Sequence, residues 1–246
     1  MASTSRRTGR DSTQLRALQT SLDGLARVDG SARFGFGTTA ALSSISGPIE
    51  VRLAAEHPSL AAFEVLLRPL SNVPTTQSKS LAATLRSALL PSLILTQNPR
   101  TLIQLVVQSL SKGTSDALVA AMLNSSTLAL LNAGSIPMRS VVCAVAVGRK
   151  KSTSEFIVDP EEEEEPSLAS HGCFAFSFAN GDARCVWTNW RSGSAAVVFD
   201  EKELAEAKDV ALDAAREVFM HIQKVCRAME GDDESDEEDD DKMVVS

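Results

Sequence analysis

Hydrophobic and polar positions along the chain alternate in several short runs that favour β-strands. Apolar stretches bounded by glycine, proline or polar residues predict strands at 39–46, 49–55, 63–68, 101–109 and 141–147. Ahead of them, residues 29–39 are typical of two short strands joined by a turn at Gly37. The first part of the chain is therefore predicted to be mainly strand, with a polar loop at 72–78.

Three other stretches have helical spacing. The first, at 78–90, has a single apolar face, made of Leu81, Leu85, Ala88 and Leu89. The second, at 115–133, is hydrophobic nearly all round and should be buried; Ser115 can cap its start and Gly134 ends it. The third, at 200–229, is long and amphipathic.

The remaining apolar runs, at 156–158, 173–178 and 184–190, predict a meander with Asn180-Gly181 as its hairpin turn. The order is thus strands, helix, strand, long helix, strands, long helix. This order favours an α+β fold with an antiparallel or mixed sheet packed on helices, because regular strand–helix alternation is missing.

The 246 residues are 43% hydrophobic, which is enough for one compact domain or two small ones sharing a core. No run of about 18 apolar residues exists to span a membrane, and the Ser/Thr/Arg-rich start is not a secretory signal. The four cysteines lack a CxxC spacing and are Cys143, Cys173, Cys185 and Cys226. Buried reduced thiols in a nuclear or cytosolic protein are favoured over disulfides or zinc.

The net charge of −8 is local. Residues 232–242 hold nine acids and one lysine, and Glu161–Glu165 add five more acids, so the rest of the chain is about +5. A mildly basic body can touch RNA phosphates without being a strong binder by itself. Tyrosine is absent and 4% of residues are aromatic, which argues against modules that read bases by stacking.

Trp187 and Trp190 lie in the last predicted strand of the meander. Their spacing of three does not place both on one face of a strand. Either one of them is exposed and available to a partner, or both belong to the core around a bulge.

Five short segments carry a family resemblance through their residues and their order. They are DGSAR at 29–33, SGPIEVR at 46–52, Pro58-Ser59-Leu60-Ala61 with Glu64-Val65 and Arg68-Pro69-Leu70, NPRT at 98–101, and NAGSIPMR at 132–139. Together they resemble the RNase PH family, in its branch that builds the ring of the eukaryotic RNA exosome. The corner Gly134-Ser135-Ile136-Pro137-Met138 after a buried helix is the most specific of these signals.

The resemblance covers roughly residues 25 to 225 and implies the ribosomal protein S5 domain 2-like fold, a mixed sheet packed on helices. It divides the chain into a flexible N-terminal arm and lead-in at 1–24, an RNase PH-like domain at 25–230, and a disordered acidic tail at 231–246. The implied partners are other RNase PH-like subunits, first as a heterodimer and then as a hexameric ring, three S1- or KH-containing cap proteins, a separate nuclease and RNA in the channel. Neither a membrane, a cofactor nor a metal is implied.

Cleavage of RNA with phosphate, the activity of the family, needs groups that this sequence has replaced. Where the family has a Gly-Asp-Thr turn, the carboxylate is replaced by Thr38. Where it has a Gly-Gly-Thr-Arg phosphate loop at a helix start, residues 112–115 read Lys-Gly-Thr-Ser, so the arginine is Ser115. Lys112 would supply charge only from the wrong side, and an ordinary glycine turn with a serine cap is the favoured alternative.

The family's two catalytic aspartates are also absent. An ungapped overlay from Val158-Asp159 places Glu165 at the first of them and His171 at the second. Dense like charge at 161–165 favours a solvated surface loop, and His171 is also interpreted as a loop residue. The resemblance therefore predicts a chain that is not an enzyme.

Five basic residues fall in segments that face the pore or a neighbour in relatives, and they are candidates for RNA contact through phosphate: Arg33, Arg68, Lys79, Arg86 and Arg100. Each is alternatively a solvated surface cation. In the tail, Ser235 precedes acids and is a possible phosphosite.

The sequence thus predicts a non-catalytic structural subunit of the exosome ring, which supports RNA processing and degradation, including rRNA maturation, in the nucleus, nucleolus and cytoplasm. Two alternatives remain. One is a weak phosphorolytic or hydrolytic ribonuclease that uses Glu165 and Lys112. The other is an RNA- or protein-binding homodimer that works outside the exosome.

Overall fold

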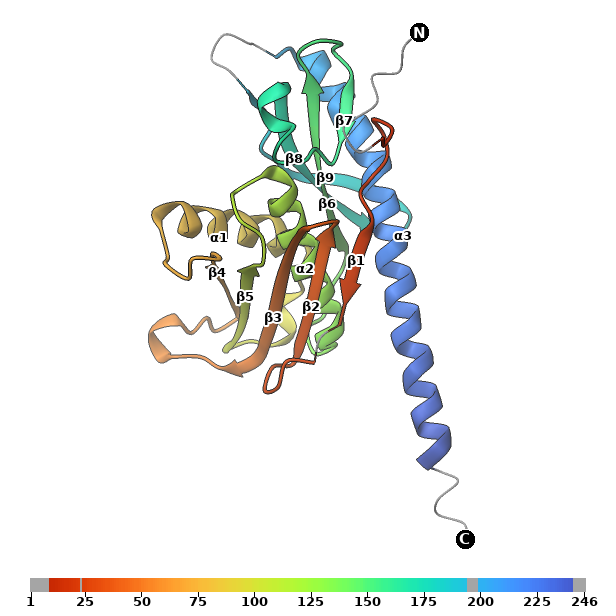
Figure 1. Cartoon of the computed structure of the whole chain (residues 1–246). Coiled ribbons are helices and arrows are strands. Elements are labelled where there is room, and N and C mark those ends of the chain that lie inside the picture. Colours follow the sequence, from red (N-terminus) through yellow and green to blue (C-terminus); the bar gives the residue numbers. More distant parts are fainter. Residues whose placement is uncertain (1–8, 23, 194–198, 241–246) are drawn as a thin grey trace.

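The protein, described here by a computed structural model, is an α+β molecule with two sheets and three helices over residues 9–22, 24–193 and 199–240 (Figure 1). The first sheet has the strand order β1-β2-β3-β5-β4. Its strands are β1 Leu18–Ser21, β2 Gly30–Phe36, β3 Thr39–Glu50, β4 Ala62–Arg68 and β5 Thr101–Ser109. Only β4 and β5 are parallel, so the sheet is mixed, as the sequence predicts.

The second sheet is antiparallel and is built around β6 and β8. Its strands are β6 Val141–Lys150, β7 Phe156–Val158, β8 Leu168–Ala179, β9 Asp182–Thr188 and β10 Arg191–Ser192. The predicted hairpin turn between β8 and β9 is confirmed: Asn180 and Gly181 both have positive φ, the conformation that an Asn-Gly turn provides.

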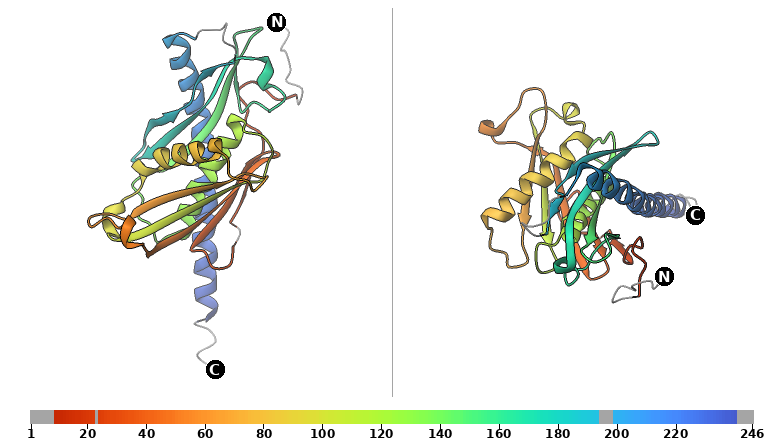
Figure 2. Two further views of the ribbon diagram at one scale, coloured as in Figure 1. Left: turned by 90° about the vertical axis from the view of Figure 1, so that its left-hand side faces the viewer. Right: turned by 90° about the horizontal axis from the view of Figure 1, so that it is seen from above.

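The helices separate the sheets into layers. Helices α1 Thr76–Leu89 and α2 Asp116–Ala133 lie on one side of the first sheet, and α2 also packs on β6 and β8 of the second (Figure 2). The long helix α3, Glu201–Asp240, packs on the far side of the second sheet and runs past the body of the molecule (Figure 1). No helix in the described ranges is both long enough and apolar enough to cross a membrane.

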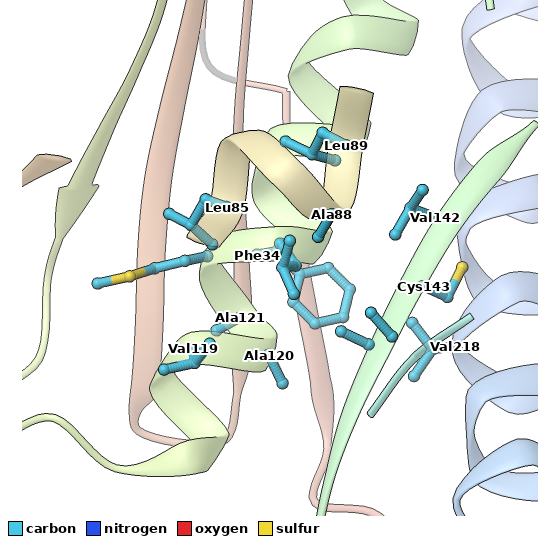
Figure 3. Close-up of a cluster of buried hydrophobic side chains, with 14 of the residues drawn as sticks. Phe34, Leu85, Ala88, Leu89, Val119, Ala120, Ala121, Val142, Cys143 and Val218 are labelled. Atoms are coloured by element: carbon cyan, nitrogen blue, oxygen red, sulfur yellow. The ribbon is translucent and has the colours of Figure 1, made fainter. Parts of the chain in front are cut away.

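Helix α2 is the centre of the hydrophobic core, and its capping by Ser115 and Gly134 is confirmed. Figure 3 shows Val119, Ala120 and Ala121 of α2 in one cluster with Phe34 of β2, while Val218 of α3 lies beyond β6. A helix buried on every side has no room for unsatisfied polar groups. Its polar side chains therefore bond to both sheets.

These bonds replace strand pairing along the part of β6 that has no neighbouring strand on the side of α2. The side-chain amide of Asn124 donates to the carbonyl of Ala144 at 2.9 Å and accepts from its N–H at 2.7 Å. The Thr127 hydroxyl donates to the carbonyl of Val142 at 2.8 Å. Toward the first sheet, the Ser43 and Ser125 hydroxyls are 2.7 Å apart.

The structure corrects two sequence predictions in the first sheet. No separate strand covers 49–55, because β3 continues through a bulge at Gly47 to Glu50 and a short 3-10 helix, Leu53–Ala55, follows. Residues 9–22 of the expected flexible arm are packed: they contain β1, and Leu15 lies in the core. Residues 1–8 lie outside the described part of the chain.

Two helix boundaries also differ. Helix α1 begins before residue 78, because Thr75 and Ser78 form a capping box at its start. Helix α3, predicted to end at 229, continues to Asp240, so the first ten residues of the tail predicted to be disordered are helical. Residues 241–246 are not described.

We expect Asn124→Leu to lower the free energy of unfolding by about 2–4 kcal/mol, because it leaves both backbone groups of Ala144 buried without partners. Urea unfolding followed by circular dichroism measures the change. Gln97→Leu, which replaces an exposed side-chain amide by leucine, is the control and should change little. Equal stability of the two variants would show that Asn124 is not needed to satisfy β6.

Candidate functional site

The candidate site lies at the N-terminus of α2, where the resemblance places phosphate binding. Ser115 is buried and its hydroxyl accepts a hydrogen bond from the backbone N–H of Leu118 at 3.2 Å, the contact of an ordinary N-cap. Ser111, in the preceding loop, donates to the carbonyl of Thr38 at 3.0 Å and accepts from the N–H of Ala40 at 2.9 Å. The glycine turn of the first sheet is thereby tied to this helix start.

Asp116, the first residue of α2, organises the site from a nearly buried position, with its side chain 2% exposed. One carboxylate oxygen accepts from Nδ1 of His171 at 2.5 Å. The other accepts from the side-chain amide of Asn189 and from the guanidinium of Arg191, each at 3.0 Å. Asn189 in turn accepts from the backbone N–H of Cys173 at 2.5 Å. The network joins α2, β8 and β10 in one cluster.

Two carboxyl groups in this cluster have pKa values displaced in opposite directions. Burial raises the pKa of Asp116, but the hydrogen bond from His171 and the charge of Arg191 outweigh it, so the pKa lies below its ordinary value. Burial raises the pKa of Glu165, and the nearby charge of Asp116 adds to this, so the pKa lies above its ordinary value. Glu165 Oε1 is buried and has no hydrogen-bond partner among the described residues.

Glu162 approaches the glycine turn that precedes α2. A Cβ atom added to Gly113, which has a φ of +81°, would lie 2.6 Å from Oε1 of Glu162. The carboxylate end of Glu162 therefore lies against the glycine turn that precedes α2. The segment is held by Asp159, whose carboxylate accepts from Nε and Nη2 of Arg16, each at 2.6 Å.

Two cavities flank the helix start. One, of about 460 Å³, contains Asp116, Trp187, Asn189 and Arg191 in its wall. The other, of about 430 Å³, is mainly apolar and lies beside Lys112 and Gly113. Trp187 is half-buried, whereas Trp190 is buried against Phe156 and Phe174. Trp187 packs against the core and also lines the first cavity, and a bulge at Val186 precedes it, so each alternative holds in part.

The four predicted degenerate positions gather at this end of the molecule. Ser115, Glu165 and His171 surround the first turn of α2, whereas Thr38 is exposed and is linked to this end through its backbone carbonyl, which accepts from Ser111. The prediction of His171 as a loop residue is wrong: it lies in β8, because that strand starts at Leu168 rather than near Cys173. The reading of 161–165 as only a solvated surface loop is also wrong for Glu165, whose burial alters its pKa.

Sequence reasoning missed the residues that make the network, Asp116, Asn189 and Arg191. No motif marks them, since they are brought together by the contact of a helix start with two strands. An acid directly after a serine cap was the available signal for Asp116. Within the described residues, no cluster of three or more His, Cys, Asp or Glu side chains suits a metal ion.

The five predicted RNA-contact cations are all exposed and come from different parts of the chain. Lys79 and Arg86 border a groove of about 540 Å³ between α1 and β4. Arg33 and Arg68 lie on β2 and β4, and Arg100 pairs with Glu56 at 3.4 Å. The four cysteines make no disulfide; Cys143 and Cys173 are buried, and Cys185 and Cys226 are half-buried.

Comparison with known proteins agrees with the fold. Residues 14–135 match the model of the 3′ exoribonuclease family, domain 1 (RNase PH). The chain is 34% identical over 170 residues to exosome complex component RRP46 of Saccharomyces cerevisiae, covering 67% of this chain and 76% of that protein. It is 31% identical over 172 residues to the exosome complex exonuclease RRP46 homolog of Oryza sativa, covering 70% and 71%.

Solved structures give the same result. The crystal structure of rice Rrp46 superimposes with a TM-score of 0.77 and 25% identity, over 90% of this chain and 100% of that one. An archaeal exosome core subunit superimposes with a TM-score of 0.71 over 89% of this chain and 91% of that one, and its 19% identity supports the fold alone.

The opposite pKa displacements predict opposite effects of two amide substitutions on stability. Asp116→Asn should destabilise the protein at neutral pH by about 2–3 kcal/mol, because it removes charged hydrogen bonds. The deficit should shrink as pH falls below the ordinary aspartate value of 3.8. Glu165→Gln should stabilise the protein at neutral pH and lose this advantage below the ordinary glutamate value of 4.5.

Denaturant unfolding from roughly pH 3 to pH 8 measures both effects. Glu217→Gln, at an exposed position of α3, is the control and should follow the wild type throughout. If Glu165→Gln were less stable than the wild type at neutral pH, the assignment of a destabilising buried carboxylate would be wrong.

Proposed function

The chain belongs to the RNase PH family and resembles its exosome components of the RRP46 type, and on this premise we propose that it is a non-catalytic structural subunit of the hexameric ring of an RNA exosome. It pairs with another RNase PH-like subunit, and the ring supports 3′-to-5′ RNA processing and degradation, including rRNA maturation. The cap proteins with S1 or KH domains, the separate nuclease and RNA in the channel belong to the same proposal.

The proposal that the chain is non-catalytic rests on the charge around the start of α2. A helix N-terminus attracts anions through its free N–H groups and its dipole. Here the chain's own carboxylates, Asp116, Glu162 and Glu165, already surround it. A phosphate ion would meet this negative charge without the arginine that the family places at Ser115.

The cations near the helix start do not compensate. Arg191 is engaged with Asp116 at 3.0 Å, and the side chain of His171 bonds to the other oxygen of the same carboxylate. Lys112 is exposed beside the apolar cavity. The position that would hold phosphate is therefore unfavourable to it, which supports a subunit that no longer performs phosphorolysis.

One observation favours the rival of weak catalysis. Asp116 with a lowered pKa and Glu165 with a raised pKa lie close together beside His171, and carboxyl groups displaced in this way can share acid and base roles. Hydrolysis or phosphorolysis through Glu165 is thus the second candidate function, and an activity assay separates the two.

We expect native mass spectrometry of the chain with RNase PH-like partners to show a one-to-one heterodimer that grows into a hexamer. Neither the free chain nor this assembly should shorten an end-labelled RNA in a phosphate-dependent manner. Activity that persists in Ser115→Ala and Glu165→Ala would point to a contaminating nuclease. Activity abolished by either change would contradict the non-catalytic proposal, and a stable homodimer that ignores the partners would contradict the ring.

RNA contact is proposed where Lys79 and Arg86 border one groove. Arg86 uses Nε to donate to the carbonyl of Phe63 at 2.8 Å, which fixes the guanidinium at the groove. Such contacts would be to phosphate and independent of sequence. Arg100 remains a candidate at the surface, with its side chain 69% exposed.

Lys79→Glu in the assembled ring should weaken protection of RNA about tenfold and reduce the dependence of binding on salt. Arg100→Glu is tested in parallel, and unchanged protection would remove Arg100 from the candidates. Arg216→Glu, on the exposed side of α3, is the charge-matched control. If Lys79→Glu and the control bind RNA equally well, the groove is not the contact.

Localisation in the nucleus, nucleolus and cytoplasm is part of the same proposal and can be followed with a fluorescent tag. Phosphorylation of Ser235 also stays a proposal, since its side chain lies outside the described part of the structure. Added charge there would deepen the negative potential of the tail.

A further inference from the structure

The hairpin of β6 and β7 carries a run of cations that hydroxyl side chains follow directly. Residues 149–154 read Arg-Lys-Lys-Ser-Thr-Ser, and 149–151 is the only stretch of three consecutive basic residues in the sequence. Strand β6 ends at Lys150 and β7 begins at Phe156, so the three hydroxyls lie in the loop between two paired strands. Positive charge and hydroxyls are therefore presented together at one turn, which we call the β6–β7 loop.

The β6–β7 loop is exposed and is closed at its base. Residues 151–155 are all exposed. The backbone N–H of Lys150 donates to the carbonyl of Glu155 at 3.0 Å, so the chain reverses direction within a few residues. The side chains at 152–154 make no hydrogen bond to another residue in the described part of the chain. Their hydroxyls are therefore accessible to an enzyme that modifies them.

The two lysines before the hydroxyls are held by bonds that a protein partner can replace. Nζ of Lys150 lies 3.3 Å from Oε2 of Glu155, whose side chain is 45% exposed. Nζ of Lys151 donates to the carbonyl of Pro166 at 2.9 Å, at the surface. Exposed ion pairs contribute little to stability. The carboxylates of a bound enzyme can therefore take over both ammonium groups at low cost.

Three cations followed by a serine match the substrates of one class of enzyme. Basophilic protein kinases use their own carboxylates to recognise Arg or Lys two and three residues before the acceptor. For Ser152 these positions hold Lys150 and Arg149, and Lys151 adds a third charge. For Thr153 they hold lysines alone. Because arginine can form the bidentate pair with a carboxylate, Ser152 is the better acceptor of the two.

The position of the hairpin makes Arg149 accessible through a local opening. Arg149 donates Nη1 to Glu203 at the start of α3 at 2.8 Å, and its side chain is 26% exposed. The hairpin and the start of α3 lie at the same end of the molecule (Figure 1). Strand β7 has three residues and lies at the edge of its sheet. A short edge strand with few contacts opens at a small cost in free energy.

We propose that Ser152 is a phosphorylation site for a basophilic serine/threonine kinase that uses ATP. Oγ of Ser152 forms a bond to the γ-phosphorus of ATP, and the bond from this phosphorus to the β–γ bridging oxygen breaks. ADP leaves with the electron pair of the broken bond, and the hydroxyl proton passes to a carboxylate base of the kinase. The site differs in kind from Ser235, which precedes acids and suits an acidophilic kinase.

Phosphate on Ser152 would change the bonds of the loop as well as its charge. Three cations and Glu155 flank the hydroxyls, and a phosphate of about −1.5 to −2 nearly cancels their excess positive charge. Its oxygens are stronger acceptors for the adjacent Nζ of Lys151 than the carbonyl of Pro166 is. Pro166 belongs to the 3-10 turn Glu165–Ser167, which borders the candidate site. The modification is thus placed to loosen that turn.

Phosphate transfer to the full chain tests the site. The catalytic subunit of cAMP-dependent protein kinase, a basophilic enzyme, should phosphorylate Ser152, and tandem mass spectrometry locates the phosphate. Ser152→Ala should abolish incorporation at the loop. Ser87→Ala, at an exposed serine of α1 that a single arginine precedes, is the control and should keep the wild-type level. A wild-type chain that takes up phosphate only at Thr153, at Ser154 or outside the loop would overturn the proposal.

The cations are tested with the acceptor left in place. Lys150→Ala with Lys151→Ala should lower kcat/KM for phosphorylation of Ser152 about tenfold. Lys224→Ala with Arg227→Ala removes two exposed cations of α3 and is the charge-matched control. Equal rates for the lysine variant and this control would contradict recognition by a basophilic enzyme. Equally fast modification of Ser152 by an acidophilic kinase would contradict it too.

Hydrogen exchange measures the effect on the candidate site. In the phosphorylated chain the backbone N–H groups of 164–167 should exchange roughly threefold faster, because the turn has lost its bond from Lys151. Lys151→Ala should give the same increase without phosphate, while α1 serves as the internal control. Unchanged exchange of the turn in a chain that carries phosphate on Ser152 would show that the modification does not reach the candidate site. Circular dichroism of each variant confirms that the fold is retained.

Discussion

Burial of α2 between two sheets is the constraint on which the rest of the structure depends. A helix in this position must be apolar on every side, and each polar group it carries must find a partner, because water is absent. Asn124 and Thr127 meet this requirement by bonding to backbone groups of β6 that no strand reaches. The helix thus acts for β6 as a neighbouring strand would, and the two sheets are held at a fixed separation.

The same constraint locates the candidate site. A helix enclosed between two sheets starts where their edges come together, so Asp116 meets side chains from β8 and β10 at once. The ion pair between Arg16 and Asp159 brings the acidic 161–165 segment to the start of α2. The acids are therefore placed by the packing of the fold. Their effect is electrostatic: they surround a helix start that would otherwise attract an anion.

Helices and central strands could be predicted because their signals are local. The caps of α2 at Ser115 and Gly134, and the bounds of β5 and β7, follow from residues next to each other in the sequence. The errors arose where distant contacts decide. Strand β1 forms because β2 offers an edge to pair with. Strand β3 continues beyond the bulge at Gly47 because β5 pairs with it on both sides of the bulge. The network of Asp116 needs three elements in contact, which no local pattern encodes.

The placement of charge at the start of α2 decides which ligands this end of the molecule can hold. At the start of α2, acids accumulate where a phosphorolytic enzyme needs an anion to bind. Carboxylates at this position oppose the binding of a small anion, because the field of the helix start is already met by the chain's own charge. The hydrophobic core and the placement of these acids both depend on α2 holding the two sheets in place.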